Sequence, residues 1–281
     1  MDYSKLKFDI IILAGQSNAE GNGLSNSTEP TIIEDAYEAL DLNGYKMELD
    51  MSKPFYEQAK LSFVFPTQIH IRSLQERLNG NKEPAADLTL SFVPLYQKEF
   101  LDSDRKVIVV KAAIGGTGFA RRQQGVNYDI HKRCLSMVDQ VLELNPENRI
   151  VALLWHQGEH DAFEFPEKGN EKRYLDYKEA FLAQVRDLMN HYNNPKLPVV
   201  TGGFIEDWRH TGYHKQCLAI EKALQDSMVE LGCGGFVSAE GLRSNKQDGL
   251  FDDNIHFSKA SVLELGRRYF EAYKHIKELT K

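Results

Sequence analysis

The sequence has few cysteines and no long apolar run. Its three cysteines, Cys134, Cys217 and Cys233, lack paired spacing, which argues against a disulfide scaffold and favours a reducing compartment. The first apolar run, Phe8–Ala14, is too short for a signal peptide or a membrane span. We therefore expect a cytoplasmic protein that does not contact a membrane. An exported parent protein that has lost its signal peptide stays open as an alternative.

Basic stripes and nucleotide-binding loops are also absent from the sequence. The net charge is −7, from 41 acidic and 34 basic residues, and the basic residues form no stripe, so we expect no nucleic-acid partner. Residues 15–23 fit neither G-x-x-x-x-G-K-[ST] nor G-x-G-x-x-G, which opposes a phosphate or dinucleotide loop there. Nothing in the composition indicates an oligomeric state.

Short apolar runs alternate with amphipathic stretches along most of the chain. Five runs have the character of buried parallel strands: Phe8–Ala14, Val107–Ala112, Ile150–Trp155, Leu197–Thr201 and Gly235–Ser238. Four stretches have helical periodicity: Cys134–Leu144, Tyr174–Tyr192, Cys217–Leu231 and Ser258–Leu279. This alternation predicts an α/β fold with a three-layer, doubly wound parallel sheet.

The segment between the first two predicted strands is less regular and rich in proline. We expect Leu24–Asp104 to be a long insertion after the first strand, within a single domain that spans residues 1–281. Two short helices are predicted in it, near Phe65–Leu78 and Tyr96–Leu101. The role of this insertion does not follow from its sequence.

Polar turns follow three of the predicted strands. They are Gly-Gln-Ser-Asn at 15–18, Gly-Gly-Thr-Gly at 115–118 and His-Gln-Gly-Glu-His-Asp at 156–161. Near the C-terminus, Asp253 precedes His256 by three residues, just before the last predicted helix. Because sites in doubly wound sheets gather beyond the C-terminal ends of the strands, we expect all four segments to meet at one edge.

Ser17, His256 and Asp253 are the residue types that an activated serine nucleophile needs. A serine on a tight turn projects its hydroxyl above the sheet, a histidine takes the hydroxyl proton, and a carboxylate orients the histidine. Attack on an ester creates an oxyanion, which requires preorganised hydrogen-bond donors. Three donors are available: the backbone N–H of Ser17, that of Gly115 or Gly116, and the side-chain amide of Gln157.

With these blocks in this order, the chain resembles the SGNH hydrolases. More narrowly, it resembles their sialate O-acetylesterase-like branch, also called carbohydrate esterase family six. That branch carries Gly-Gln-Ser-Asn and Gly-Gly-Thr/Ser blocks, as at 15–18 and 115–117 here. Its third block, Trp-x-Gln-Gly-Glu-x-Asp, matches Trp155–Asp161, and its last block, Asp-x-x-His, matches Asp253 and His256.

The resemblance implies a serine esterase that removes O-acetyl groups from a carbohydrate, of the acetylxylan or sialic-acid type, without a metal or other cofactor. Ser17 would be the nucleophile, His256 the general base and then acid, and Asp253 the residue that orients His256. The oxyanion hole would be formed by Ser17, by Gly115 or Gly116, and by Gln157. The supporting residues would be Gln16, Asn18, Glu159 and Asp161.

The substrate implied by the resemblance is a small-molecule or oligosaccharide acetyl ester. Polymer-degrading members of the family would usually be exported, and this chain shows no evident secretion signal. A small acetylated sugar handled inside the cell is therefore favoured. The sequence does not indicate which sugar it is or which hydroxyl carries the acetyl group.

Two other interpretations stay open. His156, Glu159 and His160 form the H-x-x-E-H pattern that holds zinc on one helix in inverzincins. Gly158 and the β-like run before it oppose a helix at this position. The second alternative is a non-catalytic sugar-binding protein on a decayed esterase fold, although all three residue types of the triad are present.

Overall fold

The computed structural model describes residues 1–27, 29–53, 59–78, 83–163 and 169–279. Its centre is a seven-stranded sheet in the order β12-β11-β10-β1-β9-β3-β6. The strands are β1 (Lys7–Gly15), β3 (Ile32–Asp41), β6 (Ile69–Gln75), β9 (Arg105–Lys111), β10 (Arg149–His156), β11 (Val199–Gly202) and β12 (Gly234–Val237). All neighbouring pairs are parallel except β3 with β6. The predicted parallel sheet is thereby confirmed in its main part.

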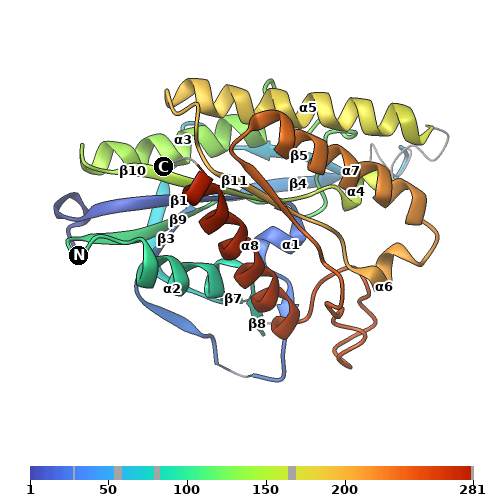
Figure 1. Cartoon of the computed structure of the whole chain (residues 1–281), viewed down its shortest axis with the longest axis horizontal. Helices are drawn as coiled ribbons and strands as arrows, with labels where there is room; N and C mark the ends of the chain where they lie inside the picture. Colours follow the sequence, from blue (N-terminus) through green and yellow to red (C-terminus); the bar gives the residue numbers. More distant parts are fainter. Residues whose placement is uncertain (28, 54–58, 79–82, 164–168, 280–281) are drawn as a thin grey trace.

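Helices cover both faces of the sheet, so the molecule has three layers (Figure 1). One face carries α3 (Asp129–Leu144), α5 (Asn170–His191) and α7 (His214–Leu231), and the other carries α2 (Thr89–Glu99) and α8 (Lys259–Leu279). The short helices are η1 (Tyr3–Lys5), α1 (Ser17–Glu20), α4 (Glu159–Phe163) and α6 (Glu206–Arg209). The five predicted strands and four predicted long helices are all present with shifted ends, which confirms the predicted fold class.

β1 lies in the middle of the sheet because most of its side chains are apolar, on both faces. Phe8 and Ile10–Leu13 are fully buried. β9 pairs with one side of β1 and β10 with the other, both in parallel. The carboxyl ends of these three strands are therefore neighbours, and the polar turns that follow them share one edge of the sheet.

The irregular segment after β1 extends the central sheet. Its strand β3 pairs in parallel with β9, and its strand β6 pairs antiparallel with β3. Smaller sheets are made by β2 (Gly23–Leu24), β4 (Tyr45–Leu49), β5 (Ala59–Phe63), β7 (Arg77–Leu78) and β8 (Pro84–Ala86). The insertion thus builds the wall of the molecule that adjoins the turn after β1.

Of the two helices predicted in this segment, the one near Phe65–Leu78 is wrong. Ile69–Gln75 forms the edge strand β6, in which the half-buried Ile69 and Ile71 alternate with the exposed His70. The helix predicted near Tyr96–Leu101 exists as α2, but it begins and ends earlier.

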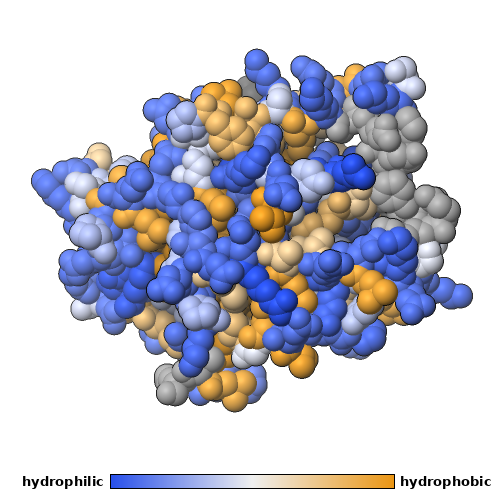
Figure 2. All heavy atoms as spheres, turned by 90° about the horizontal axis from the view of Figure 1, so that it is seen from above, coloured by the Kyte–Doolittle hydropathy of each residue, from blue (hydrophilic) through white to orange (hydrophobic). Residues whose placement is uncertain are grey.

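The face of the molecule that carries α3 and α5 is largely hydrophilic. Viewed from the side of α3 and α5, charged and polar residues cover most of this face, and apolar residues form small patches (Figure 2). In the part of the chain that the structure describes, no helix is both long and apolar enough to cross a bilayer.

Candidate active site

The turn after β1 requires a glycine at position 15. Gly15 has a φ of +132°, and a Cβ there would lie 2.1 Å from the carbonyl oxygen of His156. The same carbonyl accepts the backbone N–H of Gln16 at 3.0 Å, which fastens the end of β1 to β10. The chain then enters α1 directly, so Ser17 begins a helix at the carboxyl edge of the sheet.

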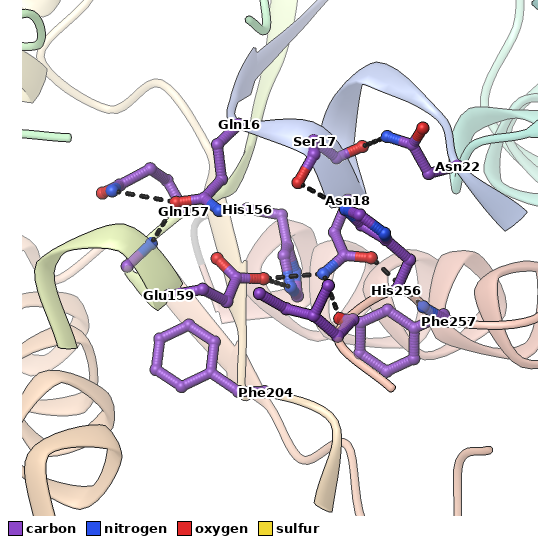
Figure 3. A network of polar contacts seen from close by, with 12 residues as sticks. Gln16, Ser17, Asn18, Asn22, His156, Gln157, Glu159, Phe204, His256 and Phe257 are labelled. Carbon is purple, nitrogen blue, oxygen red and sulfur yellow. Dashed lines mark hydrogen bonds and ion pairs between the residues drawn. The ribbon is translucent and has the colours of Figure 1, made fainter. Parts of the chain in front are cut away.

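Ser17, His256 and Asp253 form one hydrogen-bonded chain at this edge. Ser17 Oγ lies 2.8 Å from His256 Nε2 (Figure 3), and His256 Nδ1 lies 2.8 Å from Asp253 Oδ2. An ionised Asp253 places the ring proton on Nδ1, which leaves Nε2 to accept the hydroxyl proton of Ser17. The structure therefore brings the three predicted triad residues together in the required order.

Asp253 is held as a carboxylate by its neighbours. Partial burial opposes its charge, but His256 and the Asn245 amide outweigh burial, so the pKa of Asp253 is lowered from its ordinary value. Asn245 Nδ2 donates to Asp253 Oδ2 at 2.9 Å, while Asn245 Oδ1 accepts the N–H of Leu24 at 3.0 Å. No sequence motif pointed to Asn245, because its partner Leu24 is 221 residues away along the chain.

Asn18 connects the serine turn to the loop that carries the histidine. Its Nδ2 donates to Glu159 Oε1 at 2.7 Å and to the carbonyl of Ile255 at 3.1 Å (Figure 3). Its Oδ1 accepts the backbone N–H of Phe257 at 3.2 Å. Because Ile255 and Phe257 flank His256, this amide fixes the backbone on both sides of the histidine.

Glu159 is a fully buried carboxylate that Asn18 and His156 keep ionised. Burial opposes the charge, but the contacts with His156 and Asn18 outweigh it, and the pKa of Glu159 is lowered. His156 Nε2 lies 3.6 Å from Glu159 Oε1, and His156 Nδ1 lies 2.9 Å from the Tyr269 hydroxyl. The carboxylate therefore anchors the Asn18 amide from inside the protein.

The H-x-x-E-H stretch does not lie on one helix. His156 is the last residue of β10, whereas Glu159 and His160 belong to α4, and Gly158 between them has a φ of +142°. An inverzincin site needs both imidazoles on one helical face, so the geometry removes the basis of the zinc-peptidase alternative. Within the described ranges, no group of three or more His, Cys, Asp or Glu side chains could hold a metal ion.

Gln157 lies beneath the second polar turn and is fully buried. Its Nε2 is 3.1 Å from the carbonyl of Thr117, 2.5 Å from Asp161 Oδ2 and 3.2 Å from Gln16 Oε1. Asp161 also accepts the N–H of Ala120 at 2.6 Å. Burial raises the pKa of Asp161, and these donors offset only part of that rise. Since the amide hydrogens of Gln157 already face internal acceptors, its role as an oxyanion donor stays a prediction.

The two glycines predicted as alternative donors have different surroundings. Gly115 lies against Ser17, and its N–H donates to Glu20 Oε2 at 2.8 Å. Arg77 holds the other oxygen of that carboxylate, Oε1, at 2.6 Å. Gly116 has a φ of +69° and open space around the position of a Cβ. Within the described residues, the N–H groups of Ser17 and Gly116 have no hydrogen-bond acceptor, so these two are available to a ligand.

A doubly wound sheet with a serine, a histidine and a carboxylate in one hydrogen-bonded chain at its carboxyl edge is typical of α/β hydrolytic enzymes with a serine nucleophile. A family model described as "Carbohydrate esterase, sialic acid-specific acetylesterase" matches residues 7–275. The chain belongs to this family, which confirms the predicted resemblance, and it is a carboxylic ester hydrolase. A comparison with curated proteins gave no match.

Solved structures share the fold at low sequence identity. NanS superposes with a TM-score of 0.69 at 17% identity, over 97% of this chain and 98% of that chain. A protein of Arabidopsis thaliana gives a TM-score of 0.62 at 17% identity, with 95% and 98% covered. A carbohydrate acetylesterase of Xanthomonas citri gives 0.60 at 12% identity, covering 95% of this chain and 56% of that one. At such identities the likeness shows a common fold only.

Proposed function

We propose that this protein is a serine esterase that removes O-acetyl groups from a carbohydrate through an acetyl-enzyme intermediate. The observation that carries the proposal is the 2.8 Å contact between Ser17 Oγ and His256 Nε2, with Asp253 behind the imidazole. The description of the family and the name of the Xanthomonas citri enzyme support an acetylated sugar as the substrate, and the family description names sialic acid. The acetylxylan type is proposed from the sequence resemblance alone.

The reaction has two halves. Ser17 Oγ attacks the acetyl carbonyl carbon while His256 Nε2 takes the hydroxyl proton. In this proposal, the N–H groups of Ser17 and Gly116, which have no acceptor among the described residues, receive the negative charge that develops on the carbonyl oxygen. The sugar oxygen then leaves with the proton from His256, and the acetyl group stays on Ser17. In the second half, water gives a proton to His256 and attacks the acetyl carbonyl carbon; the bond to Ser17 Oγ then breaks as His256 returns this proton to Oγ, which releases acetic acid, present as acetate at neutral pH, and restores the free serine.

The first test measures acetate release from 4-nitrophenyl acetate and from a panel of acetylated sugars. Wild type should turn over the esters, and the Ser17→Ala variant should lose this activity. A Ser17→Ala variant that retains the wild-type rate would contradict the serine mechanism. The decayed-fold alternative makes the opposite prediction, in which wild type binds sugars without releasing acetate.

The pH profile gives an independent check on the base. Only a neutral imidazole can accept the serine proton, so a histidine base predicts that kcat/KM falls on acidification. Asp253 remains a carboxylate over this range because its pKa is lowered. A rate that stays flat down to about pH 4 would show that no histidine acts as the base.

A further inference from the structure

A groove of about 520 Å³ is lined in part by segments that lie close to the triad residues along the chain. Leu24–Ser27, which follows α1, lines one wall, and Gly249–Phe251, which precedes Asp253, lines another; Glu83 and Pro84 complete the lining. The two walls come from opposite ends of the chain, and along the sequence both adjoin residues of the candidate active site.

Phe251 is unusual in this groove in two respects. It is 58% exposed, so its ring is not held in place by the core. Its φ is +58°, in the left-handed region that bulky residues rarely adopt. Such conformations persist where the surrounding structure imposes them, and they cluster at ligand-binding sites. An exposed aromatic ring is thus presented to the groove at a conformational cost.

Asn245 joins both walls of the groove to the triad. It is fully buried, and its side chain bonds Asp253 Oδ2 at 2.9 Å and the N–H of Leu24 at 3.0 Å. Its backbone carbonyl accepts the N–H of Leu250 at 2.8 Å, next to Phe251. One residue therefore fixes the groove relative to the catalytic carboxylate, so an occupant of the groove has a defined position relative to Ser17.

The chemistry of the walls fits a sugar ring. The face of an aromatic side chain packs against the C–H face of a pyranose, and a large ring supplies much contact area at low entropic cost. The exposed amide of Asn26 and the hydroxyl of Ser25 offer both donors and acceptors to sugar hydroxyls. Ligand sites commonly combine an apolar surface with a few polar groups in this way.

Resting on the proposed acetylesterase function, we propose that this groove is a subsite for a sugar ring next to the acetylated one, with Phe251 as its stacking platform. The substrate is then an oligosaccharide or polysaccharide ester, in contrast to the small acetylated sugar favoured by the sequence. Binding energy gained on the neighbouring ring positions the acetyl group at Ser17 and raises kcat/KM.

The test compares esters with and without a neighbouring ring. The probes are 4-nitrophenyl acetate, chemically acetylated methyl xyloside and methyl mannoside, and chemically acetylated xylotetraose and mannotetraose. For the preferred sugar, wild type should show a kcat/KM about tenfold higher on the tetrasaccharide than on the methyl glycoside, which is the scale of one good stacking contact. The Phe251→Ala variant should lose this gain and keep the wild-type rate on 4-nitrophenyl acetate.

Two further variants control for structural effects. The Phe251→Trp variant retains an aromatic face and should retain the gain. Phe65 is a second exposed phenylalanine, at 45%, outside the groove, and the Phe65→Ala variant should behave as wild type on every probe. The proposal is overturned if Phe251→Ala slows 4-nitrophenyl acetate equally, if the gain survives in Phe251→Ala, or if wild type shows no gain with either sugar. A wild type inactive on all probes contradicts the acetylesterase function itself.

Binding can also be measured without turnover. In the Ser17→Ala background, the Phe251→Trp substitution adds an exposed fluorophore to a chain whose own Trp155 and Trp208 are buried. Acetylated xylotetraose or mannotetraose should change the emission in a saturable way, and the same titration with Phe65→Trp should show no change. A flat titration with both tetrasaccharides overturns the subsite.

Discussion

Asn18 holds the backbone on both sides of His256. Its amide nitrogen bonds the carbonyl of Ile255 at 3.1 Å, and its amide oxygen bonds the N–H of Phe257 at 3.2 Å. Asn18 follows Ser17 directly, so the nucleophile and the loop of the base are connected through one side chain. The 2.8 Å contact between Ser17 and His256 therefore depends on a residue that takes no part in proton transfer.

The Asn18→Ala variant should lower kcat by about 10²-fold with little change in KM, because a displacement of about 1 Å in a reacting group costs this much. Steady-state kinetics on 4-nitrophenyl acetate measures the effect, and the labelling rate of Ser17 by a fluorophosphonate should fall in parallel. Asn145→Ala is the matched control. Asn145 directly follows α3, its amide donates to the carbonyl of Ser4, and it does not contact the site. A folded Asn18→Ala variant with wild-type kcat would refute the positioning role.

Glu159 should make the stability of the protein depend on pH. Its pKa is lowered in the folded state from the ordinary value of 4.5, so the unfolded chain binds its proton more readily. The stabilisation from the carboxylate is thus fully present above about pH 4.5 and is lost as the pH falls through the folded pKa. The Glu159→Gln variant can still accept the Asn18 hydrogen bond but carries no charge.

We expect Glu159→Gln to be less stable than wild type by about 2 kcal/mol at pH 7, the scale of a hydrogen bond to a charged group. The difference should shrink as the pH falls below about 4.5 and through the lowered pKa of Glu159, because the carboxylate then takes up a proton and both proteins lack the charge. Urea unfolding at several pH values measures it. A stability difference that does not change with pH would mean that the charge of Glu159 does not contribute.

The central strands were predictable because their burial is continuous. Ile10–Leu13 is apolar at every position, as a strand covered on both faces requires. The edge strand β6 was missed because Ile69 and Ile71 are only half buried there, so the apolar signal is short and mixed with polar residues. Partners on β3, far away in the sequence, decide its structure.

The site was predictable where it depends on local spacing and not where it depends on long-range contacts. Asp253 and His256 share one loop, so a gap of three residues was enough to pair them. Asn245 accepts the backbone N–H of Leu24, and Glu20 accepts the backbone N–H of Gly115. The two residues of each pair lie far apart in the sequence and share no motif. Polar side chains of this kind are common in loops, and only the fold assigns them a partner.

Gly15 should be far less tolerant of substitution than a glycine with free space around its Cβ position, such as Gly44. Gly15→Ala would place a Cβ 2.1 Å from a backbone oxygen at a φ of +132°, so we expect a loss of about 4 kcal/mol from the clash and the strain. Gly44 has a φ of +59° with nothing within 4 Å of its Cβ position, and Gly44→Ala should cost only about 1 kcal/mol. Urea unfolding of both variants gives the comparison, and equal losses would contradict the turn geometry.

Gln157 could act in one of two ways: as a hydrogen-bond donor to the substrate, or as a structural support of the turn at residues 115–118. Substituting Gln157 tells the two roles apart. Its amide bonds Thr117 and Asp161 and is fully buried, so Gln157→Ala should lower the melting temperature and release the turn that carries Gly116. We expect kcat to fall together with stability, because the donor at Gly116 loses its support. The measurement is kcat and Tm for Gln157→Ala beside Gln97→Ala. Gln97 is a control on α2 whose amide donates to the carbonyl of Glu34 at an exposed position.

The opposite result would assign the predicted oxyanion role to Gln157. A fall in kcat of about 10²–10³ with an unchanged Tm is the signature of a lost oxyanion donor. In that case the amide would have to leave Asp161 when substrate binds, and Asp161 would lose a hydrogen bond that stabilises its carboxylate. Substrate turnover would then depend on the protonation of Asp161, and the pH profile of kcat would show a second titrating group in wild type that is absent from Gln157→Ala.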